Sequence, residues 1–135
     1  MIPLPRDAEL QPASTVPIKK EEAREQARLV AGLRFCWSKI FDDSERPIVF
    51  HIPNGGQRDA REGSNLKTQG VLAGIPDLEI ICPRGRTIRI EMKKLNDATI
   101  SVEQATLIDH ISQLGHEVFV AYSAEDALAK LRKLP

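Results

Sequence analysis

Two carboxylates and a lysine lie at the matching ends of two short apolar segments, in a pattern that could hold a metal ion. Asp77 opens the segment 77–82, whereas Glu91 and Lys93 close the segment 86–93. If the two segments pair as an antiparallel hairpin, Asp77 lies opposite Glu91, where two like charges repel each other. Hard cations such as Mg²⁺ bind carboxylate oxygens and complete their coordination with water and phosphate oxygens. The pattern therefore predicts a Mg²⁺ site, with Lys93 near enough to orient or activate a water.

The loop between the two segments decides which residues face each other. A loop of two residues would set Glu91 opposite the apolar Leu78, and the apolar faces of the strands would not match. A loop of three residues, Pro83-Arg84-Gly85, has Pro where a type I turn favours it and Gly at a left-handed bulge position. It also sets Glu79 opposite Arg89, which is a favourable pair. We therefore expect the three-residue loop, and with it the opposed carboxylates.

The same residues also suit a strand that faces solvent. Alternating charge on one face is common in antiparallel sheets that are exposed on one side. On the residues alone, a structural or assembly protein with a solvated polar strand face therefore stays open beside the metal site.

The elements that would position these residues follow from hydrophobic periodicity and turn residues. Their order, in which helices and strands alternate around the hairpin, predicts a mixed β-sheet flanked by helices, an α/β class. The expected elements are one long helix over 19–40, a strand over 47–54, a short helix over 60–69, the two hairpin strands, a helix over 101–114, a strand over 117–122 and a helix over 123–134.

The length of 135 residues fits a single domain. Residues 1–17 carry four prolines and are expected to form a flexible tail before a domain over 18–135. No apolar run has the length of a membrane span or a signal peptide. The 19 basic and 19 acidic residues exclude a polybasic binder but allow a local basic patch. Cys36 and Cys82 form no C-x-x-C pair, so we expect a reducing cytoplasm.

The segment Pro76-Asp77, followed by Glu91-Met92-Lys93, resembles the PD-(D/E)xK signature of a large nuclease superfamily. Within it, the chain is most similar to the VRR-NUC family, in particular to its small stand-alone members from phages and bacteria. The likeness covers roughly residues 20 to 125. It is carried by His51-Ile-Pro-Asn54, Lys67 with Gly70, Gly74-Ile-Pro-Asp77, Ile90-Glu-Met-Lys93, Ser101-Val-Glu-Gln104 and the stretch 115–123.

The resemblance implies a restriction-endonuclease-like core and a metal-dependent endonuclease that hydrolyses phosphodiester bonds in DNA. Asp77 and Glu91 would bind Mg²⁺ or Mn²⁺, the backbone carbonyl of Met92 would add a ligand, and Lys93 would help to activate the attacking water. Such enzymes are similar to junction-resolving nucleases, which implies selectivity for branched DNA and a homodimer with two sites. The expected location is the cytoplasm of a bacterium or of a phage-infected host cell.

Two further site residues follow from the resemblance. The family carries a glutamate on its first helix, for which Glu22 is the candidate and Glu21 and Glu25 compete; a charged helix start explains them equally well. Gln104 belongs near the active site, beside the lysine. It also completes a capping box with Ser101, and the two roles are compatible.

The segment 84–94 is locally basic, which predicts a track for the phosphate backbone of DNA. A nucleic-acid-binding module that keeps this fold but does not cut is the alternative function. The expected DNA-binding residues are Lys67, Arg84, Arg86, Arg89 and Lys94.

Overall fold

The computed structural model describes residues 20–42, 44–53, 60–94 and 99–135. The tail expected over residues 1–17 lies outside this part of the chain. The elements, in chain order, are α2 (Lys20–Phe35), α3 (Trp37–Ile40), β1 (Ile48–His51), α4 (Ala60–Thr68), β2 (Leu78–Ile81), the 3-10 turn η1 (Pro83–Gly85), β3 (Thr87–Met92), α5 (Val102–Gln113), β4 (Glu117–Ala121) and α6 (Ala124–Arg132).

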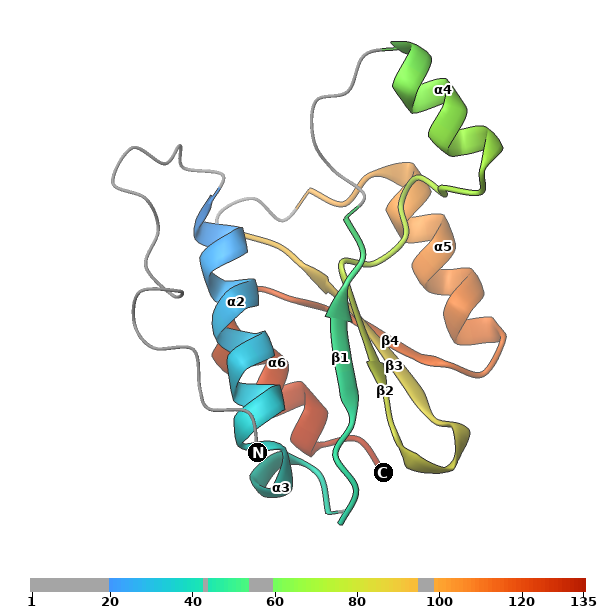
Figure 1. The fold of residues 1–135 in the computed structure, drawn as a ribbon. Coiled ribbons are helices and arrows are strands. Elements are labelled where there is room, and N and C mark those ends of the chain that lie inside the picture. Colours follow the sequence, from blue (N-terminus) through green and yellow to red (C-terminus); the bar gives the residue numbers. More distant parts are fainter. Residues whose placement is uncertain (1–19, 43, 54–59, 95–98) are drawn as a thin grey trace.

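The four strands form one mixed sheet in the order β1-β2-β3-β4 (Figure 1). β2 runs antiparallel to both β1 and β3, whereas β3 and β4 run parallel. A parallel pair needs a crossover connection, and α5 lies on that connection. The α/β class and the mixed sheet predicted from the sequence are therefore confirmed.

The β2–β3 hairpin has the predicted register. Leu78 faces Ile90 and Glu79 faces Arg89. The backbone N–H of Cys82 donates to the carbonyl of Arg86 at 2.8 Å, which closes a three-residue loop over 83–85. The expected type I geometry is wrong at one position. Arg84 has φ 63° and ψ 31°, in the left-handed region, where a type I turn would need φ near −90°. Gly85 is also left-handed, at φ 77°.

The expectation of one long helix over 19–40 is also wrong, because the helix breaks at Cys36. This residue has φ −117° and ψ 24°, and a separate single turn, α3, follows it. The sequence around the break, Phe35-Cys36-Trp37, consists of weak helix formers and follows Gly32. The break redirects the chain towards β1. The short helix expected over 60–69 is present as α4.

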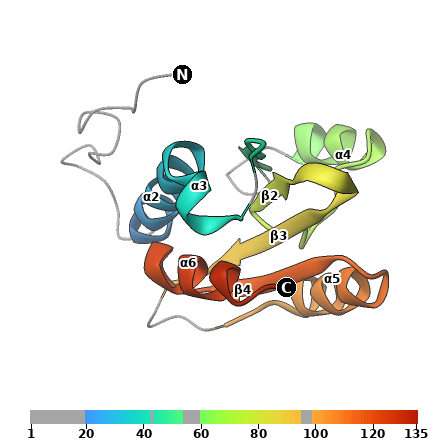
Figure 2. The same cartoon turned by 90° about the horizontal axis from the view of Figure 1, so that it is seen from below.

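Helices cover the sheet on both faces. α2, α3 and α6 lie on one face, and α4 and α5 lie on the side of the other face, as Figures 1 and 2 show from two directions. The main core forms under α2 and α6, where even-numbered residues of β2 and β3 pack. Its members are Leu29, Leu33, Val49, Leu78, Ile80, Ile88, Ile90, Met92, Ala121, Ala124, Ala127 and Leu131.

Strand alternation then directs the odd-numbered residues of β3, Arg89 and Glu91, to the face of α5. The carboxylates of interest are thus separated from the main core by the sheet itself. No helix in the described part of the chain is long and apolar enough to cross a membrane.

Candidate functional site

Asp77 is fixed by contacts from both neighbouring strands. It lies one position before the Leu78–Ile90 pair, and is therefore opposite Glu91. Its carboxylate oxygen Oδ2 accepts a hydrogen bond of 2.9 Å from the backbone N–H of Met92 in β3. Its carbonyl oxygen accepts one of 2.8 Å from the backbone N–H of Ile52, just past β1. These bonds hold the Asp77 side chain at the open end of the hairpin, opposite the loop, which we call the mouth of the hairpin.

The carbonyl oxygen of Asp77 also bonds the imidazole Nδ1 of His51, at 2.9 Å. His51 is exposed and ends β1. The sequence could not assign this contact, because 26 residues separate the two positions.

Glu91 is the one buried charged residue in the described part of the chain, with 2% of its surface exposed. Its Oε1 accepts a hydrogen bond of 3.0 Å from Nε2 of Gln104. Its Oε2 is buried and has no hydrogen-bond partner. A buried polar atom without a partner costs free energy, so this oxygen needs an explanation.

The pKa of Glu91 is raised from its ordinary value of 4.5 to about 8, and burial is the largest cause. The negative charge of Asp77 contributes to this rise, as does a hydrogen bond to Asp77 that only a protonated Glu91 can form. Lys93 acts in the opposite direction, and Glu22 adds a small increase. Both groups are therefore close enough to Glu91 to influence its charge.

The donor set at this mouth fits a hard divalent cation. Two ionised carboxylates are acceptors only, so neither satisfies the other. Either a shared proton or a cation supplies the missing partner of Glu91 Oε2. Within the described ranges, no three His, Cys, Asp or Glu side chains gather closely enough to hold a metal. The carboxylate part of the site is therefore the Asp77–Glu91 pair.

Gln104 forms the predicted capping box and also contacts Glu91. Its backbone N–H donates to Ser101 Oγ at 3.1 Å, and its side-chain Oε1 accepts from the Ser101 backbone N–H at 3.0 Å. This reciprocal pair is a capping box at the start of α5. Its Nε2 remains available, and this atom donates to Glu91. One amide group therefore caps the helix and orients the buried carboxylate.

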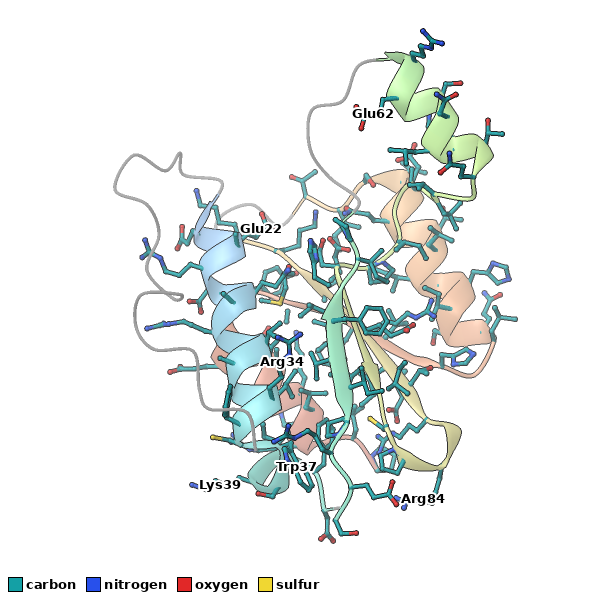
Figure 3. The ribbon with its side chains drawn as sticks, in the orientation of Figure 1. Glu22, Arg34, Trp37, Lys39, Glu62 and Arg84 are labelled. Carbon is teal, nitrogen blue, oxygen red and sulfur yellow. The ribbon has the colours of Figure 1, made fainter. Side chains whose placement is uncertain are left out.

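The three glutamates at the start of α2 have different surroundings. Glu25 accepts from the backbone N–H of Ala124 at 3.1 Å, and Glu21 lies 4.0 Å from Lys94. Glu22 is the one whose charge raises the pKa of Glu91. It lies near the N-terminal end of α2, beside the C-terminal end of β3 (Figure 3). Of the three candidates, Glu22 is therefore oriented towards the site.

Lys93 immediately follows β3 and is half-buried. Its backbone N–H donates to the carbonyl of Ala121 at 2.8 Å, which ties it to the end of β4. Its ammonium group lowers the pKa of Glu91, which places the positive charge near the two carboxylates.

The five basic residues expected to bind DNA lie in three regions. Arg89, which pairs with Glu79, lies two residues before Glu91 on β3, and Lys94 lies just beyond the end of this strand. Arg86 forms two bonds of 2.8 Å to Glu117. It is five residues from Glu91, about 16 Å along the strand. Arg84 lies at the hairpin tip (Figure 3), and Lys67 is exposed on α4.

A solved structure described as a "VRR_NUC domain protein" is similar to this chain. The two are 25% identical, the match covers 81% of this chain and 86% of the other, and the TM-score is 0.58. The fold is therefore VRR-NUC-like, as the sequence motifs implied. No protein-family model matches the chain, and no curated protein matches it.

Proposed function

We propose that this chain is a divalent-metal-dependent deoxyribonuclease that hydrolyses phosphodiester bonds. The observation that carries the proposal is the Asp77–Glu91 pair, with its buried and unpartnered Glu91 Oε2. Ionised carboxylates in such surroundings destabilise a fold unless a cation compensates them. Several classes of enzyme bind a metal with such a pair. The likeness to a VRR_NUC domain protein favours a nuclease among them.

Each residue of the site has a defined part in the proposal. Asp77 and Glu91 would hold Mg²⁺ or Mn²⁺ through oxygen atoms, the ligands that these ions prefer. Gln104 bonds one oxygen of Glu91, and the other, which has no hydrogen-bond partner, would bind the ion. The bound cation would offset the charge of the phosphodiester and lower the pKa of a bound water. Lys93 would orient that water with its ammonium group.

Two other groups would complete the ion's surroundings. Met92 lies beside the carboxylate pair, because its N–H bonds Asp77. Its backbone carbonyl would add an oxygen ligand. Glu22 would act through its charge or through a bound water, because three acidic side chains do not gather at direct metal-holding distance in the described residues.

The proposed substrate is branched or junction-like DNA, cut by a homodimer. The described part of one chain carries one such carboxylate pair. Two cuts in opposing strands need two such sites, which a two-fold axis would supply. The basic residues Lys67, Arg84, Arg86, Arg89 and Lys94 are the proposed contacts to the DNA backbone. Arg86 bonds Glu117 through Nε and Nη2, and Arg89 bonds Glu79 through Nη2. The Nη1 group of each arginine would contact phosphate.

The test is cleavage of a panel of labelled DNAs (duplex, flap, four-way junction and single strand) with Mg²⁺, with Mn²⁺ and in chelator. We expect cleavage with either ion and none in chelator. Asp77→Asn, Glu91→Gln and Lys93→Ala should each abolish cleavage while the circular dichroism spectrum stays native. Glu125→Gln, which neutralises an exposed carboxylate on α6, is the matched control and should cut at the parent rate.

The result that contradicts the proposal is a folded parent that cuts none of these DNAs with either ion. Metal-independent binding to the same DNAs without cleavage would identify the alternative, a silent nucleic-acid-binding module. A module of that kind has no use for a buried glutamate opposite a second carboxylate, so we favour the nuclease.

A further inference from the structure

Gly74 makes an unusually close backbone contact with the start of α5. A Cβ atom at this position would lie 2.8 Å from the carbonyl carbon of Glu103 and 2.9 Å from the backbone nitrogen of Gln104. Carbon atoms normally approach each other to about 3.5–4.0 Å. The atoms in contact belong to the helix backbone, so they cannot move aside as the end of a flexible side chain can.

The contact joins the two segments that supply the proposed metal site. On one side, Gly74 is followed by Ile75 and by the fully buried Pro76, and then by Asp77. The proline fixes its own φ angle, so little slack remains in this short connection. On the other side, Gln104 lies in the first turn of α5 and donates a hydrogen bond to Glu91. A displacement at Gly74 would therefore move Asp77 and Gln104 apart.

We propose that Gly74 is a positioning residue of the active site. Its missing side chain lets the 74–77 segment pack against the first turn of α5, and this packing sets the spacing between Asp77 and the Gln104–Glu91 pair. The consequence for catalysis rests on the proposed nuclease function, whereas the packing itself does not. Misplacing catalytic groups by about 1 Å can reduce a rate about 100-fold.

The position also needs a left-handed backbone, so a simple substitution would mix two effects. Gly74 has φ +89°, which L-residues adopt only with strain. Gly115, just after α5, has nearly the same φ, +93°, but a Cβ there would meet no atom within 4 Å. Gly115→Ala therefore reproduces the backbone strain of Gly74→Ala without the collision.

The first experiment compares kcat and KM for junction cleavage in Gly74→Ala and Gly115→Ala, at a temperature well below both melting points. We expect both variants to melt below the parent. Gly74→Ala should lose at least tenfold in kcat with KM changed less than threefold, whereas Gly115→Ala should stay within twofold of the parent. Equal kcat values in the two variants would overturn the proposal.

A second readout needs neither metal nor DNA. The side-chain amide signals of Gln104 in a ¹⁵N–¹H spectrum should shift in Gly74→Ala and stay in place in Gly115→Ala. If the parent cuts no DNA but the signals move in this selective way, the nuclease function fails and the positioning role stands. If the signals are unchanged in Gly74→Ala, the positioning role is wrong even if the parent is a nuclease.

A further pair of variants decides the case if Gly74→Ala does not fold. Ser101→Ala loosens the first turn of α5 from the helix side, because Ser101 caps it. Ser123→Ala removes the corresponding cap of α6, at Asp126. We expect Ser101→Ala to slow cleavage at least fivefold and to shift the Gln104 signals, whereas Ser123→Ala stays within twofold. Identical behaviour of the two cap variants would show that the first turn of α5 needs no fixed position.

Discussion

The carboxyl group of Glu91 lies where a proton and a cation would compete for the same oxygen. Burial and the neighbouring Asp77 favour the proton, whereas Lys93 favours the ionised form. The bond from Gln104 occupies Oε1, so the competition concerns Oε2. Metal affinity should therefore increase with pH until Glu91 is ionised even when no metal is bound.

The first prediction concerns stability without metal. The folded protein keeps a proton on Glu91 between pH 4.5, its ordinary pKa, and about 8, whereas the unfolded chain releases it. The stabilisation from this proton is therefore complete below pH 4.5 and is lost as pH rises towards about 8. In chelator, we expect the melting temperature of the parent to fall from pH 5 to pH 9. Glu91→Gln should remove most of this fall, and an equal fall in that variant would refute the assignment.

The second prediction concerns Asp77, the other member of the pair. Asp77→Asn keeps an oxygen that can accept from the Met92 N–H but removes one of the two opposed charges. In chelator at pH 9, above the pKa of Glu91, both carboxylates of the parent are ionised, so this variant should melt above the parent. A gain of about 1 kcal/mol corresponds to roughly 4 °C in a domain of this size.

The same variant should lose the stabilisation that Mg²⁺ gives the parent, since binding to the folded state alone stabilises it. Differential scanning calorimetry with and without Mg²⁺ measures both effects. If Asp77→Asn melts below the parent in chelator at pH 9, the two carboxylates do not repel each other in the folded protein.

At the scale of the elements, the hairpin was predictable because its determinants are local. Strand alternation and the Pro83-Arg84-Gly85 loop together fix the register, and the register places Asp77 opposite Glu91. The left-handed Arg84 was not predictable, because residues other than glycine rarely adopt that conformation. The break at Cys36 depends on where the chain must go next, which helical periodicity does not record.

The choice among the three first-helix glutamates was also beyond the sequence. Glu21, Glu22 and Glu25 have similar positions on the pattern, and α2 is far from the hairpin along the chain. Their separation depends on distant partners, Lys94 for Glu21 and Ala124 for Glu25. The role of Gly74 was hidden for the same reason, because its contact lies about thirty residues away.

The third prediction concerns α5, which links helix capping to the site. Gln104→Ala removes a capping partner, which costs about 1 kcal/mol, and leaves Oε1 of Glu91 unpaired. We therefore expect a larger loss in cleavage rate than in stability, at least tenfold in kcat. Gln113→Ala is the matched control, because it removes an exposed bond to Asp109 on the same helix. A Gln104→Ala variant that melts lower yet cuts at the parent rate would limit Gln104 to capping.

At the scale of the whole molecule, the residues of the proposed metal site and the arginines near the hairpin loop lie at opposite ends of β3. The carboxylate pair, Lys93 and Lys94 lie where β3 ends, whereas Arg84 and Arg86 lie at the other end, near the hairpin tip. A DNA backbone that contacts both ends would have to follow the length of β3.

The last prediction is that the protein acts as a homodimer. One metal site can cut only one strand at a time, so paired cuts in a junction need two chains in one complex. Sedimentation equilibrium at micromolar concentration should give twice the 15.0 kDa of one chain. Mixing the parent with excess Asp77→Asn should produce mixed dimers that nick one strand of a junction, so paired cuts fall more steeply than single nicks. A monomer with and without junction DNA, or paired cuts that fall in proportion to single nicks, would exclude the paired mechanism.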